Sequence, residues 1–284
     1  MRRSSRIFAP LLLVVVLLVV TACADGESAT PATAEGVQVR VSGSGTCLPL
    51  LRILSSEYLD RYPDAEIEFV FLPGLHSGGG IKGVANGDLD LGAVSRDLTE
   101  EETALGLDYH LLSRDGLVIA VHPSVTIDGL TTEQVRAIYR GDHTNWSELG
   151  GPDLPIVILD RNEDESAKII LRQYVLGPDL EITSKAVNLY YEPDMIDGLQ
   201  STIGAIGYFS LGYGISQDVP VRYLRLDGAQ ATVSNIEAGT YEMVRPLGMV
   251  TGPEADEALQ AFVEWSSSAE ARQIMESAGF APAD

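Results

Sequence analysis

The chain has 284 residues, of which 45% are hydrophobic, and these values are typical of a globular protein of one or two domains. Its 41 Asp and Glu outnumber its 19 Lys and Arg, which gives a formal net charge of −22. Because nucleic-acid phosphates are held by clustered Lys and Arg, this charge argues against a nucleic-acid partner. With only two Cys, the chain is not a disulfide-scaffolded protein.

Residues 1–22 are predicted to be a signal peptide and not part of the fold. Three Arg lie within the first six positions, and an unbroken apolar run covers residues 11–20, too short to span a bilayer but typical of a secretory signal. Thr21-Ala22-Cys23 follows and resembles a lipobox, so we expect cleavage before Cys23 and lipidation of its sulfur. An uncleaved N-terminal membrane anchor is the alternative. Residues 23–35, small and polar, predict a flexible tether.

Strands and helices are expected to alternate over the first part of the body. The apolar pattern predicts strands at 37–41, 67–71 and 89–95. A helix with its apolar face from Leu51 to Leu59 lies between the first two strands and ends at Tyr62-Pro63. A glycine-rich turn at 73–80 opens a short helix that Asn86-Gly87 closes. This alternation favours a parallel sheet with helices on both faces and ligands at the carboxyl ends of the strands.

The second part of the body is predicted to form another lobe of the same kind. Leu117–Val121 is a continuous apolar strand and the expected crossing into this lobe, and 131–140 is a helix capped by Thr131 or Thr132. The remaining elements are a strand at 155–159, a helix from Ser166, a buried strand at 203–209 and one amphipathic helix over 258–278. We therefore expect a two-lobed α/β fold with mainly parallel sheets and a ligand cleft between the lobes. Lobe 1 comprises 36–115 and 229–284, lobe 2 comprises 116–228, and the hinges lie near Arg114–Val118 and Arg222–Gly228.

Three predicted helix starts follow small hydroxyl or glycine residues. They are Ser44-Gly45-Thr46-Cys47, His76-Ser77-Gly78-Gly79 and Ser166-Ala167-Lys168. A helix start exposes unpaired N–H groups and about half a positive charge, so it receives anions well. Arg96 and Arg161, each at the end of a predicted strand, could add planar guanidinium groups for a tetrahedral oxyanion. The pattern predicts an oxyanion site.

From about Val39 to Pro282 the sequence resembles the phosphate-binding proteins of ABC importers, which have the two-lobed periplasmic-binding-protein-like fold. Of the matching segments, Leu130–Gly151 is the most specific to the family. The others are Gly43–Thr46, Ser77–Lys82, Asp88–Arg96, Gly204–Tyr208, Gly239–Tyr241 with Arg245–Leu247, and Ala278–Phe280. The resemblance implies a lipid-anchored, extracytoplasmic monomer without cofactor or metal, which captures inorganic phosphate for membrane permease subunits served by a separate ATPase.

Carried over residue by residue, the resemblance implies four anion-binding loops. They contain Thr46 and the Cys47 N–H, Ser77 with Gly78, Ser95 with Arg96, and Arg161 with Ser166 and Ala167. The chain departs from the family pattern at two places: Lys168 stands where a Thr is typical, and Arg96 stands where some members have Asp. Such an Asp would accept a hydrogen bond from protonated phosphate and repel sulfate. Glu165 or Asp164 could serve instead; alternatively they form a solvated acidic loop or pair with Arg161 and Lys168.

We expect no enzymatic activity. The sequence has no His-Glu-x-x-His, no Gly-x-Ser-x-Gly and no phosphate-loop lysine. Two alternatives to phosphate capture remain open: a binding protein for another oxyanion, either sulfate-like or a phosphorylated small molecule, and an envelope sensor on the same fold.

Overall fold

The computed structural model describes residues 36–283, so the predicted signal peptide, Cys23 and the tether lie outside the described residues. Within this range no helix has the length and apolar character needed to cross a membrane. The first elements follow the predicted alternation. They are β1 (Val37–Gly43), α1 (Leu48–Arg61), β2 (Ile67–Phe71), α2 (His76–Ala85), β3 (Leu91–Val94) and α3 (Glu100–Thr103). β1 pairs in parallel with both β2 and β3, as the alternation predicted.

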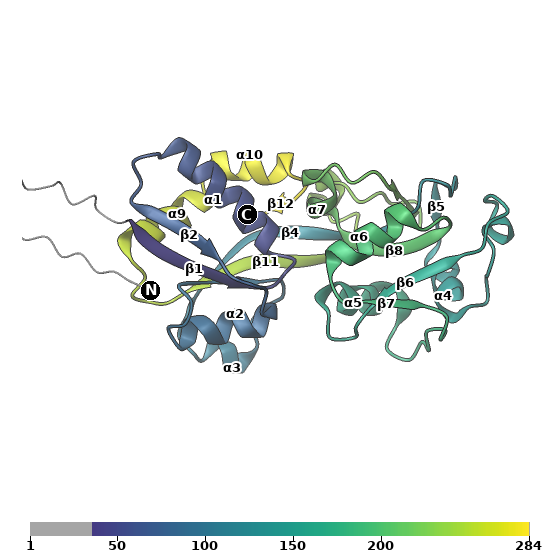
Figure 1. Ribbon diagram of the computed structural model, residues 1–284, viewed down its shortest axis with the longest axis horizontal. Coiled ribbons are helices and arrows are strands. Elements are labelled where there is room, and N and C mark those ends of the chain that lie inside the picture. The colour runs from purple at the N-terminus through teal and green to yellow at the C-terminus, as the bar shows by residue number, and fades with distance from the viewer. Residues whose placement is uncertain (1–35, 284) are drawn as a thin grey trace, which may run out of the picture. The chain divides into compact units, whose positions relative to one another are not determined.

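Two long strands interrupt the parallel arrangement. β4 (Asp108–Val121) and β11 (Val244–Thr251) pair antiparallel with each other, and β11 also lies antiparallel to β3. The strand order is β2-β1-β3-β11-β4-β8-β6-β7, in which β8 is Ala205–Ser210, β6 is Val157–Arg161 and β7 is Val187–Leu189. The sequence predicted only the apolar end of β4 and none of β11, so the sheet is mixed where it was expected to be mainly parallel. In Figure 1, β4 and β11 run from the elements around β1 to those around β6.

The elements after β4 build the second part of the sheet and its cover. They are β5 (Gly129–Leu130), α4 (Thr132–Arg140), the 3-10 helix η1 (Trp146–Leu149), β6 (Val157–Arg161), α5 (Ser166–Leu171), the π-helix η2 (Arg172–Leu176), β7 (Val187–Leu189), α6 (Glu192–Ser201), β8 (Ala205–Ser210), α7 (Leu211–Ser216), β9 (Arg222–Tyr223), β10 (Arg225–Leu226) and α8 (Val233–Glu237). Thr131 caps α4 by accepting the Gln134 N–H, and Gly141 ends it in the left-handed region at φ 88°, so this predicted helix is confirmed.

The C-terminal region forms two helices where one was predicted. α9 (Glu257–Ser266) and α10 (Ala269–Ser277) are separated at Ser267 and Ser268, and Ser268 caps α10 by accepting the Ala271 N–H. The prediction of one continuous helix was therefore wrong, because the Ser268 side chain caps the first turn of a new helix. The short β12 (Ala281–Pro282) pairs with β4. α1, α9 and α10 lie on one face of the sheet, and α2 and α3 lie on the other (Figure 1).

The described residues contain two large apolar cores. One joins β1 and α1 to α9 and α10, with Phe262 packed edge-on against Tyr58 at a ring-centroid distance of 5.4 Å. The other surrounds the far end of β4 together with β6, β8 and α4. Ile236 and Tyr241 pack in this second core, although they fall within the range predicted for lobe 1. The division into lobes stays a prediction, but this packing favours β11 over Arg222–Gly228 as the return crossing.

Candidate anion-binding cleft

A cavity of about 680 Å³ lies where β1, β3 and β6 end and α2, α5 and α6 begin. Seven of the nine predicted ligand residues line it: Thr46, Ser77, Gly78, Ser95, Arg96, Arg161 and Ser166. Cys47 and Ala167 are buried and do not line it. The predicted loops therefore meet at one place. β1 and β3 are parallel, so their carboxyl ends share one edge, whereas β6 runs in the opposite direction in the same sheet and its carboxyl end reaches the cavity from the other side.

Serine hydroxyls form the floor of the cavity on the side of β1 and β3. Ser44 Oγ donates to Ser95 Oγ at 2.7 Å, and the Ser95 N–H donates to Ser77 Oγ at 3.1 Å. Close packing brings these loops together, since a Cβ on Gly80 of α2 would lie 2.8 Å from the Gly43 Cα. Glycine at both positions lets the start of α2 approach the end of β1.

Cys47 belongs to the interior below this floor. Its N–H donates to the Ser44 carbonyl oxygen at 3.0 Å, and its thiol lies 3.3 Å from the Gly248 carbonyl oxygen. Burial raises the pKa of the Cys47 thiol to about 12. The expectation that the Cys47 N–H faces an anion is therefore not met, because the turn that begins α1 already uses this donor.

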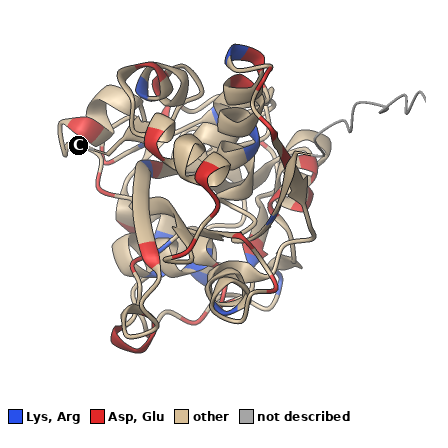
Figure 2. Ribbon diagram, turned by 90° about the vertical axis from the view of Figure 1, so that its left-hand side faces the viewer, with Lys and Arg blue, Asp and Glu red and all other residues tan. Residues whose placement is uncertain are grey.

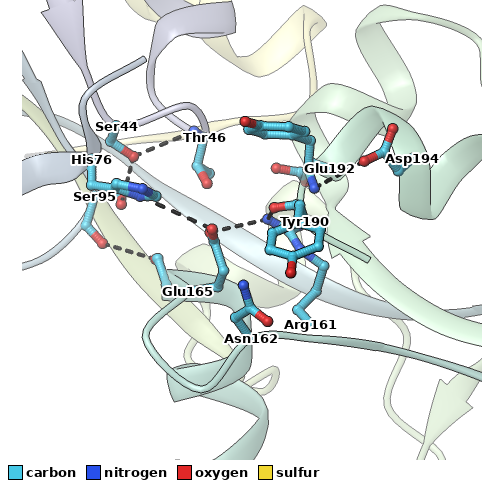
Figure 3. Close-up of polar contacts among 12 residues, drawn as sticks. Ser44, Thr46, His76, Ser95, Arg161, Asn162, Glu165, Tyr190, Glu192 and Asp194 are labelled. Carbon is cyan, nitrogen blue, oxygen red and sulfur yellow. Dashed lines mark hydrogen bonds and ion pairs between the residues drawn. The ribbon is translucent and has the colours of Figure 1, made fainter. Parts of the chain in front are cut away.

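Arg161 closes the opposite side of the cavity, at the end of β6. Its side chain is 5% exposed; Nη2 forms an ion pair with Glu165 Oε2 at 3.0 Å and donates to the Tyr190 carbonyl oxygen at 3.0 Å (Figure 3). Its Nε is buried and has no hydrogen-bond partner among residues 36–283. The guanidinium is thus held in place from one side and keeps a donor without a partner.

Lys168, which occupies the position of the typical Thr, is turned away from the cavity. It is fully buried, and its Nζ lies 2.6 Å from both carboxylate oxygens of Asp160. Asp160 also accepts the Tyr208 hydroxyl at 2.8 Å, and the Tyr208 oxygen accepts the Arg161 N–H at 3.0 Å. This departure from the family pattern therefore supports Arg161 from below and adds no side chain to the cavity.

Arg96 lies at the cavity edge with its guanidinium already paired. Nη1 and Nη2 contact the two Glu102 oxygens at 2.7 and 2.8 Å. This bidentate pair lowers the pKa of Glu102 to about 2. Arg96 is therefore less available to a ligand than the sequence suggested.

Arg245 of β11 was not among the predicted site residues, although it lines the cavity. Its Nε and Nη2 donate to Asp115 Oδ2 at 3.1 and 2.9 Å, and both side chains are fully buried. Its Nη1 donates to Ser166 Oγ at 3.3 Å. The Ser166 hydroxyl in turn donates to the Ser95 carbonyl oxygen at 3.4 Å. Arg245 lies in the family-matching segment Arg245–Leu247, but its place in the cavity could not be read from that segment because its partners Asp115 and Ser166 are remote in the chain.

Residues 28–270 match the model of the PBP superfamily domain. The chain belongs to the PBP superfamily. It is 25% identical over 294 residues to the phosphate-binding protein PstS of Bacillus subtilis, covering 99% of this chain and 95% of the relative. It is 24% identical over 250 residues to the PstS of Borreliella burgdorferi, covering 85% of this chain and 88% of the relative. The resemblance to phosphate-binding proteins is thereby confirmed.

Solved structures agree with this membership. A phosphate-bound protein from Clostridium perfringens, assigned as a phosphate ABC transporter substrate-binding protein, is 28% identical with a TM-score of 0.75, covering 87% of this chain and 100% of that one. An ABC-type phosphate transport receptor from Vibrio cholerae is 26% identical with a TM-score of 0.63, covering 85% and 98%. These relatives are binding proteins and not enzymes, in agreement with the expectation for this chain.

The cleft of this PBP-superfamily protein also contains carboxyl groups. Glu165 pairs with Arg161, and His76 approaches its other oxygen at 4.0 Å from Nδ1 (Figure 3). Asp164 and Glu192 line the cavity as well, and sequence analysis did not single out Glu192. Elsewhere, Asp and Glu are spread over many elements and do not gather at one place (Figure 2). The negative net charge therefore comes mostly from groups outside the cleft.

Proposed function

We propose that this protein captures inorganic phosphate in the cleft as the substrate-binding protein of an ABC importer. The observation that carries the proposal is the convergence of hydroxyls from Ser44, Ser77, Ser95 and Ser166 with the buried Arg161 around one cavity. Hydroxyl and N–H donors hold an oxyanion without requiring net positive charge. The phosphate-binding relatives support phosphate as the ligand.

A formal net charge of −22 is compatible with anion capture. Exposed charges are screened beyond about 8 Å at physiological salt, whereas donors in a cleft act at contact distance. The buried Arg245 is balanced by Asp115, and Arg161 is paired with Glu165. Binding would therefore rest on oriented hydrogen-bond donors and on the exchange of the Arg161–Glu165 contact for a contact to the ligand.

We further propose that the two sides of the cleft belong to two lobes that close on the ligand. Ser44, Ser77 and Ser95 stand on the elements around β1, whereas Arg161 and Ser166 stand on those around β6. β4 and β11 connect these groups of elements and are the natural place for a hinge. The predicted lobes 36–115 with 229–284 and 116–228 would then be redrawn with the return crossing in β11.

Lipidation of Cys23 would hold this lobed body at the outer face of a membrane, next to permease subunits whose ATPase is a separate chain. The apolar run and the lipobox-like Thr21-Ala22-Cys23 support this arrangement. We expect labelled fatty acid to be incorporated into the full chain and lost in Cys23→Ser, with the variant released from the membrane fraction. Equal membrane retention of an unlabelled Cys23→Ser chain would instead favour an uncleaved anchor.

Isothermal titration of the protein, stripped of carried-over ligand, tests phosphate capture. We expect phosphate to bind with micromolar or tighter affinity, about −8 kcal/mol or better, and sulfate to give no heat. Heat with sulfate or a phosphorylated small molecule but not with phosphate would replace phosphate by another oxyanion. Silence with all of these ligands would contradict capture and favour a sensor.

A further inference from the structure

Arg245 is a fully buried arginine at the place where the two long strands β4 and β11 pair (Figure 1). It lies directly opposite Asp115 in the strand register, and its Nε and Nη2 donate to Asp115 Oδ2. The other oxygen, Oδ1, accepts the Ser210 hydroxyl at 2.8 Å and the Gly212 N–H at 3.2 Å. A buried ion pair with such additional hydrogen bonds is costly to break. Asp115 therefore holds the guanidinium in a fixed orientation.

The third nitrogen of the guanidinium, Nη1, connects this fixed pair to the cleft. It donates to Ser166 Oγ at 3.3 Å, and the Ser166 hydroxyl donates to the Ser95 carbonyl oxygen at 3.4 Å. Both distances exceed the usual ranges for such bonds, whereas the two contacts of Arg245 with Asp115, at 3.1 and 2.9 Å, fall within them. Arg245 is thus the fixed end of this chain of hydrogen bonds, and Ser166 is the adjustable one.

The direction of these hydrogen bonds determines what Ser166 can donate. A guanidinium has only donors, so Ser166 must accept from Arg245, and its single hydrogen is left for an acceptor elsewhere. In this structure the acceptor is the Ser95 carbonyl oxygen. An oxyanion in the cavity would offer a charged acceptor, which forms the stronger hydrogen bond. The Ser166 hydrogen would then pass from the carbonyl oxygen to the anion.

We propose that Arg245 is a positioning residue of the anion cleft, which orients Ser166 so that the Ser166 hydroxyl donates to a bound oxyanion. This inference rests on the proposed function. Arg96 and Arg161 also line the cavity, but they pair with carboxylates that lie outside this chain of hydrogen bonds. Arg245 differs from them because it acts through a second side chain and is anchored in the strands that join the two sides of the cleft.

A double-mutant cycle in phosphate affinity, measured by calorimetry, tests this role. Arg245→Lys keeps a charge beside Asp115 but loses the planar fork, and Ser166→Ala removes the hydroxyl that the fork orients. We expect Arg245→Lys to weaken phosphate binding about tenfold, the effect of one lost hydrogen bond to a charged group, but about twofold or less when Ser166→Ala is also present. A merely structural role gives the same loss in both backgrounds. Equal losses, or an unchanged affinity of folded Arg245→Lys, would overturn the proposal.

Arg96→Lys is the matched control, because it removes the fork of another arginine in the same cavity. Arg96 pairs with Glu102 through Nη1 and Nη2, and within residues 36–283 no hydrogen bond joins it to Ser166. Its effect on phosphate affinity should be the same with and without Ser166→Ala, to within about twofold. Coupling as strong as that of Arg245 would show that Ser166 responds to any cavity arginine, and would overturn the assignment to Arg245.

The phosphate complex of the unsubstituted protein gives a second readout that needs no variant. In its crystal structure Arg245 should contact both Asp115 and Ser166, with the Ser166 hydroxyl within hydrogen-bond distance of a phosphate oxygen. Loss of the contact between Arg245 and Ser166, or a Ser166 side chain turned away from a bound phosphate, would overturn the proposal and leave phosphate capture intact. If titration of the unsubstituted protein with phosphate gives no heat, the proposed function fails, and this inference fails with it.

Discussion

Replacing Arg161 by Ala removes the buried guanidinium of the proposed site. At present Nη2 contacts Glu165 Oε2 and the Tyr190 carbonyl oxygen, each at 3.0 Å, and Nε has no partner among the described residues. A hydrogen bond to a charged group contributes about 1.5–3 kcal/mol, and 1.4 kcal/mol corresponds to about a tenfold change in affinity. We therefore expect Arg161→Ala to weaken phosphate binding about tenfold to a hundredfold.

The upper end of this range is favoured, because Glu165 would lose its partner and would face the ligand as an unpaired negative charge. The double substitution Arg161→Ala with Glu165→Gln should accordingly recover part of the lost affinity, and a double-mutant cycle in calorimetry measures this coupling. Arg161→Lys serves as a control that keeps the charge and loses the planar guanidinium. Phosphate affinity that is unchanged in a folded Arg161→Ala protein would remove Arg161 from the site.

Three further predictions follow from the described contacts. Asp115→Asn leaves the Arg245 charge buried without its partner and should lower the free energy of unfolding by about 3 kcal/mol or more, measured by urea denaturation; a loss below about 1 kcal/mol would contradict this ion pair. The Cys47 thiol, whose pKa burial raises to about 12, should resist alkylation at pH 8 in a native Cys23→Ser chain and react after unfolding, whereas rapid native labelling would refute its burial. The pair with Arg96 lowers the pKa of Glu102 from an ordinary 4.5 to about 2. Its contribution to the free energy of unfolding is therefore present above pH 4.5 and is lost as the pH falls toward 2. Glu102→Gln should flatten this dependence of the free energy of unfolding on pH, and an unaltered dependence would argue against the pair.

Local sequence patterns were sufficient to predict an element when its apolar residues are buried at the spacing typical of a strand or a helix. Val39 and Val41 alternate with polar residues and are fully buried in β1, and the Thr131 cap marks the start of α4. The long β4 was shortened in the prediction because its first half mixes exposed and buried positions. β11 was missed because Pro246 and Gly248 disfavour a strand by local propensity, and pairing with strands on both sides overrides this.

The site was predictable as far as it depends on loops at strand ends. The serines after β1, β2 and β3 follow parallel strands, so their convergence follows from the topology. Their meeting with Arg161 does not follow in this way, because β6 runs in the opposite direction to β1 and β3. Arg245 and Glu192 could not be found in this way. Their places in the cavity depend on contacts with Asp115 and Ser210, which are 130 and 18 residues away in the chain. Sequence analysis also could not show that the Cys47 N–H is used within its own turn.

A crystal structure of the protein grown with phosphate would test the central claim most directly. We expect one phosphate in the cavity, with its oxygens within hydrogen-bond distance of Ser77, Ser95, Arg161 and Ser166. A phosphate bound outside this cavity, or an empty cavity at saturating phosphate, would contradict the account.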